Sequence, residues 1–248
     1  LQPLPPDTGI HFLTLPAGNV IPAHIDAVAE TDYATSITRQ GEHIKTVEHL
    51  LSALHACGIT NLLVKVHGEI PVLDGSALGF LDRIEEIGVE DQDHPVKELV
   101  IDRVWEVGDG KEKSLTIEPA EVFSVSYLLR YPQPIGEQFY EFTMDDCEGY
   151  RREIAPARTF GFVRDIKMLN ELGLGGGGRL DNFIMVGEDE VINTELRFPD
   201  EFVRHKILDV IGDFYLLGYP VRGKITARFT GHRDNIALQR KILADLGA

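Results

Sequence analysis

An imidazole and two carboxylates recur every fourth residue in the segment 204–214, which reads "RHKILDVIGDF". In a helix, residues four apart lie one turn apart on the same face, so His205, Asp209 and Asp213 would form one polar stripe. Such a stripe is costly to bury, and a divalent cation would relieve that cost. A solvated helix face with a surface ion pair would explain the same spacing, so the stripe alone does not decide between the two interpretations.

A second polar pair stands at the start of the apolar helix expected over 46–57, where "TVEHL" places Glu48 directly before His49. His49 together with His205 and Asp209 would supply three nitrogen and oxygen ligands, the composition of a catalytic zinc site with one open position. Glu48 would then be placed to take a proton from water. The alternative is a first-turn carboxylate that the helix dipole favours, beside a partly buried histidine.

Two further motifs could complete such a site. His232 follows a glycine between an expected strand and helix, and Asp213 could hold it protonated as a general acid. Thr159 lies in "ARTFGF", where its hydroxyl could donate to a developing oxyanion beside Phe160. An ordinary turn histidine, a strand-end threonine and a core phenylalanine are the alternatives.

The composition narrows the function classes. The 248 residues carry a formal net charge of −16, which argues against nonspecific nucleic-acid binding and against docking on an anionic membrane. No apolar run has the length of a membrane span and no secretory signal is evident, which indicates a cytoplasmic protein. Cys57 and Cys147 are too few for a disulfide framework, and we expect two buried, inert thiols.

Hydrophobic periodicity and turn residues predict an α+β chain with a polar linker over 89–98. The expected strands cover 9–15, 19–28, 61–68, 99–107, 113–119, 123–131, 138–144, 181–187, 190–196 and 221–229, and the expected helices 46–57, 76–87, 163–174, 204–214 and 235–246. A helix that begins with a histidine, a glycine stop and a strand occur in both halves of the chain. This repeat predicts two related halves with helices segregated from largely antiparallel sheets.

Five blocks now appear in order: "TVEHLLSALHACGITNLLVKV", "EIPVLDGSALGF", "ARTFGFVRDI", "FVRHKILDVIGDFYLLG" and "GH" at 231–232. Together they resemble the UDP-3-O-acyl-N-acetylglucosamine deacetylases, zinc enzymes of lipid A (lipopolysaccharide) biosynthesis, from about residue 28 to the C-terminus. The resemblance implies two α+β domains, each a mostly antiparallel sheet, with the helices packed between the two sheets. We expect domains at 1–94, without the family's N-terminal strand, and at 95–248, with an insert around 162–192.

The resemblance also implies the roles of individual residues. The metal, zinc or alternatively ferrous iron, would be held by His49, His205 and Asp209. Glu48 would be the general base, His232 the general acid, Asp213 its supporting carboxylate and Thr159 the oxyanion donor. The expected substrate contacts are Lys206 near the nucleotide diphosphate, Phe160, and the acyl-passage residues Ile166, Met168, Leu172 and Met185.

The implied reaction is hydrolysis of the acetamide of a UDP-linked acylated amino sugar, with release of acetate and the free amine. We expect a monomer without a membrane anchor that contacts the membrane only transiently. The same fold with a shifted acyl or sugar specificity is one alternative. A binding protein that keeps the metal site without turnover is another, although Glu48, His232 and Asp213 favour an enzyme because a structural metal site needs none of them.

Overall fold

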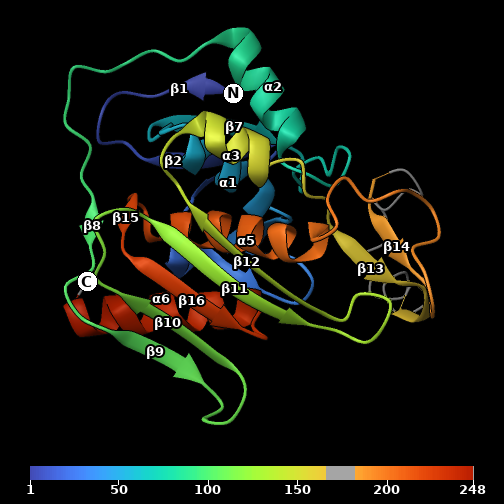
Figure 1. Ribbon diagram of the computed structural model, residues 1–248. Helices are drawn as coiled ribbons and strands as arrows, with labels where there is room; N and C mark the ends of the chain where they lie inside the picture. The colour runs from blue at the N-terminus through green and yellow to red at the C-terminus, as the bar shows by residue number, and fades with distance from the viewer. Residues whose placement is uncertain (166–181, 248) are drawn as a thin grey trace.

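The computed structural model describes residues 1–165 and 182–247 and contains two main sheets with helices between them (Figure 1). One sheet has the strand order β1-β7-β2-β3 and comprises β1 (Gln2–Pro3), β2 (Ile10–Thr14), β3 (Val20–Pro22) and β7 (Leu62–Val66). The other has the order β12-β11-β16-β10-β9 and comprises β9 (Trp105–Gly108), β10 (Ser114–Glu118), β11 (Ser124–Arg130), β12 (Glu137–Thr143) and β16 (Lys224–Arg228). A smaller three-stranded sheet has the order β4-β5-β6 and comprises β4 (Val28–Glu30), β5 (Ser36–Arg39) and β6 (Glu42–Ile44). Two further sheets have two strands each: β8 (Leu99–Val100) pairs with β15 (Val221–Arg222), and β13 (Phe160–Phe162) pairs with β14 (Ile184–Val186).

The described helices are α1 (Glu48–Ala56), α2 (Leu78–Ile87), α3 (Cys147–Glu153), α5 (Glu201–Phe214) and α6 (His232–Leu246), with short 3-10 turns η1 (Ile25–Ala27), η2 (Val163–Asp165) and η3 (Tyr215–Leu217). Helix α5 contacts β11 and β12 of the five-stranded sheet, and it also packs against α1. Figure 1 shows α1 between α5 and the strands β2 and β7. The predicted α+β class, with helices between the sheets, is therefore confirmed.

The two halves share the repeated unit that the sequence predicts. Strand β7 follows α1 and pairs in parallel with β2, while β16 follows α5 and pairs in parallel with β11. All other neighbouring strands within these two sheets are antiparallel. Each His-bearing helix therefore leads into a strand that is inserted beside an earlier strand of its own half.

Helices α1 and α5 are buried on nearly every side. All nine residues of α1 are buried, and within α5 only Arg204 and Lys206 are not. A helix buried all round belongs to the interior, so its polar side chains need partners rather than water. This burial rejects the interpretation of the stripe in α5 as a solvated face.

The crossing of α1 and α5 depends on Gly212. A Cβ atom at this position would lie 2.0 Å from the main-chain oxygen of Glu48 and 2.8 Å from its carbonyl carbon. Only a residue without a side chain lets the two backbones approach so closely. The close approach brings the first turn of α1 beside the turn of α5 that carries Asp209 and Asp213.

Two expectations are wrong. The two cysteines are not free thiols, because Cys57 and Cys147 form a disulfide that joins the end of α1 to the start of α3. Strand β14 pairs with β13 in parallel, and the segment 190–196 forms no strand but meets β14 in an isolated antiparallel bridge between Val186 and Val191. There the Asn193 side chain accepts the N–H of Met185 and donates to a neighbouring carbonyl, which satisfies backbone groups that a strand would otherwise pair.

Some expectations fall on residues 166–181 and lie outside the described residues: most of the helix predicted over 163–174, and the side chains of Ile166, Met168 and Leu172. Within the described ranges, none of the helices combines the length and apolar character needed to cross a bilayer.

Candidate active site

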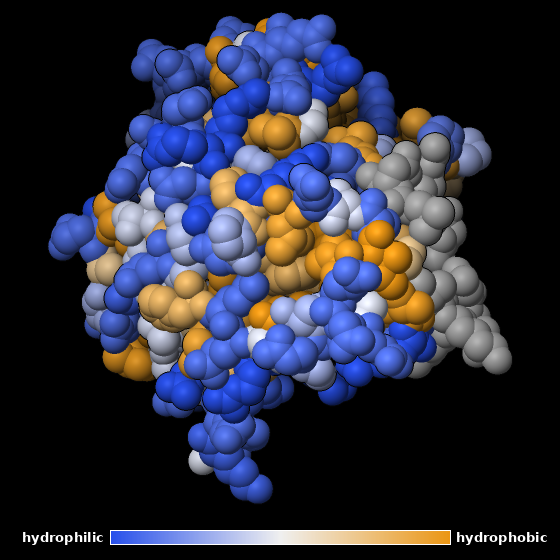
Figure 2. All heavy atoms as spheres, turned by 45° about the vertical axis from the view of Figure 1, so that its right-hand side comes forward, coloured by the Kyte–Doolittle hydropathy of each residue, from blue (hydrophilic) through white to orange (hydrophobic). Residues whose placement is uncertain are grey.

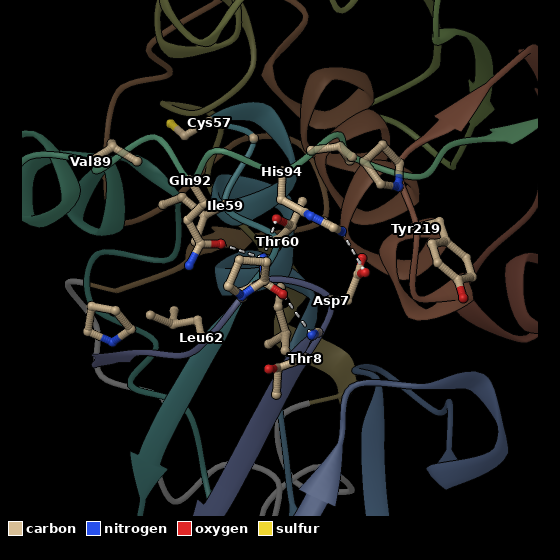
Figure 3. Close-up of a pocket in the computed structure, with 18 of the residues that line it drawn as sticks. Asp7, Thr8, Cys57, Ile59, Thr60, Leu62, Val89, Gln92, His94 and Tyr219 are labelled. Atoms are coloured by element: carbon tan, nitrogen blue, oxygen red, sulfur yellow. Dashed lines mark hydrogen bonds and ion pairs between the residues drawn. The ribbon is translucent and has the colours of Figure 1, made fainter.

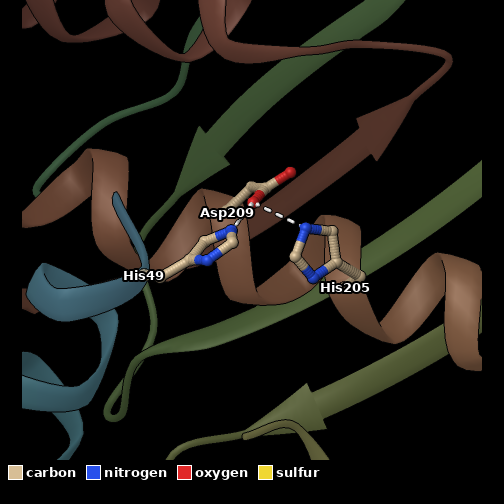
Figure 4. Close-up of side chains that lie close together, drawn as sticks. All are labelled: His49, His205 and Asp209. Atoms are coloured by element: carbon tan, nitrogen blue, oxygen red, sulfur yellow. Dashed lines mark ion pairs between the residues drawn. The ribbon is translucent and has the colours of Figure 1, made fainter. Parts of the chain in front are cut away.

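Three side chains from two helices converge in the interior. Figure 4 shows the imidazoles of His49, from α1, and His205, from α5, turned toward the carboxylate of Asp209. The Oδ1 atom of Asp209 lies 3.4 Å from Nε2 of His205 and 3.8 Å from Nε2 of His49. One nitrogen or oxygen atom from each residue lies within 4.8 Å of the other two, so the set can hold a metal ion.

The nitrogen and oxygen atoms of this trio are better arranged to bind a cation than to hydrogen-bond with one another. Asp209 Oδ1, the oxygen that faces both imidazoles, is buried without a hydrogen-bond partner among the described residues. His205 Nδ1 lies 3.0 Å from the carbonyl oxygen of Ala157 and donates to it, which leaves the lone pair on Nε2 facing Asp209. A backbone acceptor that fixes the tautomer in this way is typical of metal-ligating histidines.

Burial favours the protonation states that a metal requires. It lowers the pKa of His49 to about 3, and the neighbouring His205 adds to that shift. The pKa of His205 is also lowered, chiefly by burial. Burial by itself would raise the pKa of Asp209, but the Lys206 cation and the surrounding imidazoles outweigh it and lower that pKa. Neutral imidazoles and an ionised carboxylate are the forms that bind divalent ions.

Glu48 lies beside this trio at the first residue of α1 and is 2% exposed. Its Oε2 atom accepts the main-chain N–H of Thr35 at 3.1 Å. Burial raises the pKa of Glu48 to about 8; His232 opposes the shift, and the carboxylates of Asp209 and Asp213 add to it. A carboxylate with a pKa near neutrality is a competent proton acceptor.

A carboxylate–histidine pair completes the polar cluster. The Nδ1 of His232, the first residue of α6, lies 2.8 Å from Oδ2 of Asp213, and its Nε2 lies 3.7 Å from Oδ2 of Asp209. Burial would lower the pKa of His232, but the Asp213 and Asp209 carboxylates prevail and raise it to about 9. The two carboxylates therefore favour the protonated form of His232, whose outer nitrogen is turned toward the trio.

Thr159 stands at the start of the 160–162 strand, two residues after the carbonyl that orients His205. Its N–H donates to Gly75 at 2.7 Å, and its own carbonyl accepts the N–H of Ile184. Gly75 has φ +87°, and a Cβ there would lie 2.3 Å from the main-chain oxygen of Asn182. The threonine backbone is thus held between two loops, and the role of its hydroxyl stays a prediction.

Aromatic side chains extend from the trio toward the surface. The Phe160 ring lies 5.0 Å from Phe202, 5.6 Å from Tyr131 and 6.4 Å from His205, between ring centroids. Met185 on β14 is half-buried in the strand beside Phe160. Figure 2 shows hydrophobic surface gathered on the face that carries β13 and β14.

The side chain of Lys206 points toward the trio and not into solvent. Its Nζ lies 2.9 Å from Oδ2 of Asp209 and 5.9 Å from the centre of the Phe160 ring, and its side chain is 15% exposed. One oxygen of the Asp209 carboxylate therefore contacts the lysine, and the other faces the two imidazoles.

Three contributors were not foreseen from the sequence. Thr35 donates its hydroxyl to Oδ1 of Asp213 at 2.6 Å, and Asn235 donates from Nδ2 to Oδ2 of the same carboxylate at 2.8 Å. Gly212 permits the helix crossing. Asn235 lies three residues after His232 in α6, which begins at His232 and not at the predicted residue 235; a helix start at His232 would have suggested Asn235, but nothing in "TDYATSIT" distinguishes Thr35.

A cavity of about 870 Å³ lies elsewhere, between the start of the chain, the end of α2 and the segments 88–97 and 217–220 (Figure 3). It reaches Cys57, at the end of α1 opposite to Glu48. In it Nε2 of His94 lies 2.8 Å from Asp7, and Asn61 donates to Gln92, contacts that hold 88–97 against the first sheet. None of the predicted site residues outside the segment 166–181 lines this cavity, so we assign it no part in the chemistry.

Comparison with known proteins agrees with this arrangement. Residues 1–244 match the model of the family described as LpxC, UDP-3-O-acyl N-acetylglycosamine deacetylase. Proteins named UDP-3-O-acyl-N-acetylglucosamine deacetylase from Anaeromyxobacter dehalogenans and Nautilia profundicola are 44% and 41% identical. The first alignment covers 100% of this chain and 81% of the relative, and the second 98% and 84%. The chain therefore belongs to the UDP-3-O-acyl N-acetylglycosamine deacetylase family.

Proposed function

We propose that this chain removes the acetyl group from UDP-3-O-acyl-N-acetylglucosamine, as a metal-dependent hydrolase of lipid A biosynthesis. The observation that carries the proposal is the buried trio of His49, His205 and Asp209, in which Asp209 Oδ1 has no hydrogen-bond partner among the described residues. A proton acceptor and a carboxylate–histidine pair stand beside it. Membership of the deacetylase family supports the same reaction.

The trio would hold one divalent ion, which we propose to be zinc because two imidazoles and one carboxylate are ligands that it favours. When bound, such an ion supplies Lewis acidity, which polarises a carbonyl and makes water more acidic. The hydrogen bond from His205 to Ala157 would hold one ligand in the orientation required.

Glu48 would accept the proton of the water that attacks the acetamide carbonyl. Its pKa of about 8 supports this role, because a base is most effective when its pKa lies near the working pH. The N–H of Thr35 holds its Oε2 atom, which restricts the carboxylate to one orientation.

His232 would donate a proton to the nitrogen of the departing amino sugar. Its hydrogen bond to Asp213 supports this role, because the carboxylate orients the ring and stabilises its charged form. Thr159 would donate its hydroxyl to the oxygen of the tetrahedral intermediate, a role that rests on the family motif.

The substrate would lie across the aromatic side chains near the trio. Phe160 would contact the substrate and Met185 its acyl chain, and Lys206 would offer its positive charge toward the nucleotide diphosphate. Because the chain has a net charge of −16, an anionic substrate requires such local cations. The cytoplasmic location, the monomeric state and the transient membrane contact stay predictions.

The test is acetate release from the purified UDP-3-O-acyl-N-acetylglucosamine substrate, before and after metal removal. We expect activity that a chelator abolishes and zinc restores; reconstitution with ferrous iron compares the two candidate metals. Glu48→Gln should bind zinc and lose at least 100-fold in kcat, within the range attributed to general-base catalysis. Glu69→Gln, an exposed glutamate near the start of α1, is the matched control. Chelator-resistant release, or wild-type kcat in Glu48→Gln, would contradict the proposal.

A further inference from the structure

Thr35 is a fully buried residue between β4 and β5, with 0% exposure. Its carbonyl accepts the N–H of Val47, the residue that precedes α1, at 3.2 Å. Its own N–H donates to Oε2 of Glu48 at 3.1 Å. The backbone of Thr35 is thus attached to the start of the helix that carries Glu48.

The hydroxyl of Thr35 points the other way, toward residues far along the chain. Oγ1 lies 2.6 Å from Oδ1 of Asp213 and 3.2 Å from Nδ1 of His232. A hydroxyl has one proton, and the shorter contact assigns it to the carboxylate. The Nδ1–H of His232 then faces both Oδ2 of Asp213, at 2.8 Å, and the hydroxyl oxygen.

We propose that Thr35 is a positioning residue for the deacetylation: it holds the His232–Asp213 pair in a fixed position relative to Glu48. This inference rests on the proposed roles of Glu48 as base and His232 as acid. In the part of the chain that the structure describes, Thr35 is the residue hydrogen-bonded to both Glu48 and Asp213. Base and acid come from different helices, α1 and α6, and Thr35 links them through its N–H to Glu48 and its hydroxyl to the Asp213 that holds His232.

The geometry explains why a hydroxyl is needed and a methyl group alone is not enough. Asp213 accepts three hydrogen bonds, from Thr35, His232 and Asn235. Without the first, Oδ1 of this fully buried carboxylate loses its donor, and the carboxylate can rotate about its Cβ–Cγ bond. His232 would rotate with it, so the acid would no longer point at the leaving nitrogen.

Two pairs of variants isolate the hydroxyl. The first pair is wild type and Thr35→Val, whose side chains have the same shape but differ in the hydroxyl group. The second pair is Thr35→Ser and Thr35→Ala, which both lack the methyl group and differ in the hydroxyl group. Every variant keeps the two backbone hydrogen bonds. In each pair we expect the member without the hydroxyl to lose 10- to 100-fold in kcat, with KM changed less than twofold. Zinc content should stay at the wild-type value, and Thr35→Ser should stay within threefold of wild-type kcat.

Thr14→Val is the matched control, because Thr14 is a buried threonine of β2 whose hydroxyl donates to the carbonyl of Asn19, outside the site. It should keep wild-type kcat. Melting temperatures of all variants show that the assays report folded protein. If Thr35→Val does not fold, the Ser and Ala pair decides the question.

Placing Thr35→Val in a His232→Gln background tests whether the hydroxyl acts through the histidine. We expect kcat to change less than threefold there. The inference is overturned if the hydroxyl-free member of a folded pair keeps kcat within threefold, if the loss is in KM alone, or if Thr35→Val costs as much in the His232→Gln background as in wild type. Wild-type activity in Glu48→Gln and His232→Gln would instead show that the proposed roles themselves fail.

Discussion

Replacing Gly212 by alanine would test the helix crossing on which the site depends. The added methyl carbon would start 2.0 Å from the main-chain oxygen of Glu48, whereas ordinary contact begins at 3.4 Å. The obstacle is backbone, not the end of a flexible side chain, so relief requires α1 and α5 to separate by more than 1 Å. Separation moves Glu48 and His49 away from His205 and Asp209.

Two opposing effects set the magnitude. Overpacking a close contact costs about 1–3 kcal/mol. Replacing glycine by alanine within a helix stabilises the folded state by about 0.5–1 kcal/mol. The net loss of about 0–2.5 kcal/mol corresponds to a fall in Tm of at most roughly 10 °C for a chain of this size. The catalytic effect should be larger, because a displacement of about 1 Å can cost on the order of 100-fold in rate.

Thermal unfolding and kcat of Gly212→Ala should therefore be measured together with zinc content. Gly149→Ala is the control, because Gly149 lies in helix α3 and its added Cβ would meet only side-chain atoms, the nearest being Asp146 Oδ1 at 3.2 Å. We expect this control to keep its activity and to shift in stability by no more than about 1 kcal/mol.

The reasoning fails if Gly212→Ala keeps wild-type kcat and zinc affinity. It would also fail if the two glycine variants lost activity equally, because the loss would then not depend on the crossing. Loss of kcat with a small change in Tm would show that the crossing contributes more to positioning the base than to stability.

Three further predictions concern stability. Burial lowers the pKa of His55 to about 4, so between pH 6.5 and 4 the unfolded chain binds more protons than the folded chain. The free energy of unfolding should therefore fall by about 3 kcal/mol as the pH drops through this range. His55→Phe should weaken this pH dependence, which thermal melts at a series of pH values would measure. The Cys57–Cys147 bond spans 90 residues, and its loop entropy amounts to at most about 4–5 kcal/mol; a reductant should lower the Tm of wild type but not that of the Cys57→Ser/Cys147→Ser double variant. Glu201 is buried and pairs with Arg158 at 2.8 Å, so Glu201→Gln should cost about 3–5 kcal/mol in unfolding measurements, and a loss below 1 kcal/mol would contradict a buried charge pair.

Local periodicity accounts for what could be predicted of the site. The stripe of His205, Asp209 and Asp213 follows from helical spacing, and the structure places all three on the buried helix α5. The repeated helix–glycine–strand unit also follows from local pattern, and it reappears as the two parallel strand insertions. The roles of Glu48 and His232 were suggested by their positions beside the stripe and implied by the family resemblance, and they stay proposals.

Contacts between distant segments could not be predicted in this way. The disulfide joins residues 90 positions apart, and two cysteines alone do not indicate whether they meet. Strand β14 pairs with β13, whereas the segment 190–196 meets β14 through an isolated bridge and the Asn193 side chain, and the residue pattern of 190–196 does not distinguish these contacts from a regular strand pair. Thr35 meets Asp213 across 178 residues, and no local pattern marks such a contact.

The sequence by itself determined which side chains share a helix face, because backbone geometry fixes that spacing wherever a helix forms. Only the tertiary structure decided that α1 crosses α5 at Gly212, and that this crossing brings His49 and Glu48 to within reach of His205 and Asp209. The physical reason is that a site built from two helices depends on how closely their backbones approach. That distance is set by packing across the whole interior.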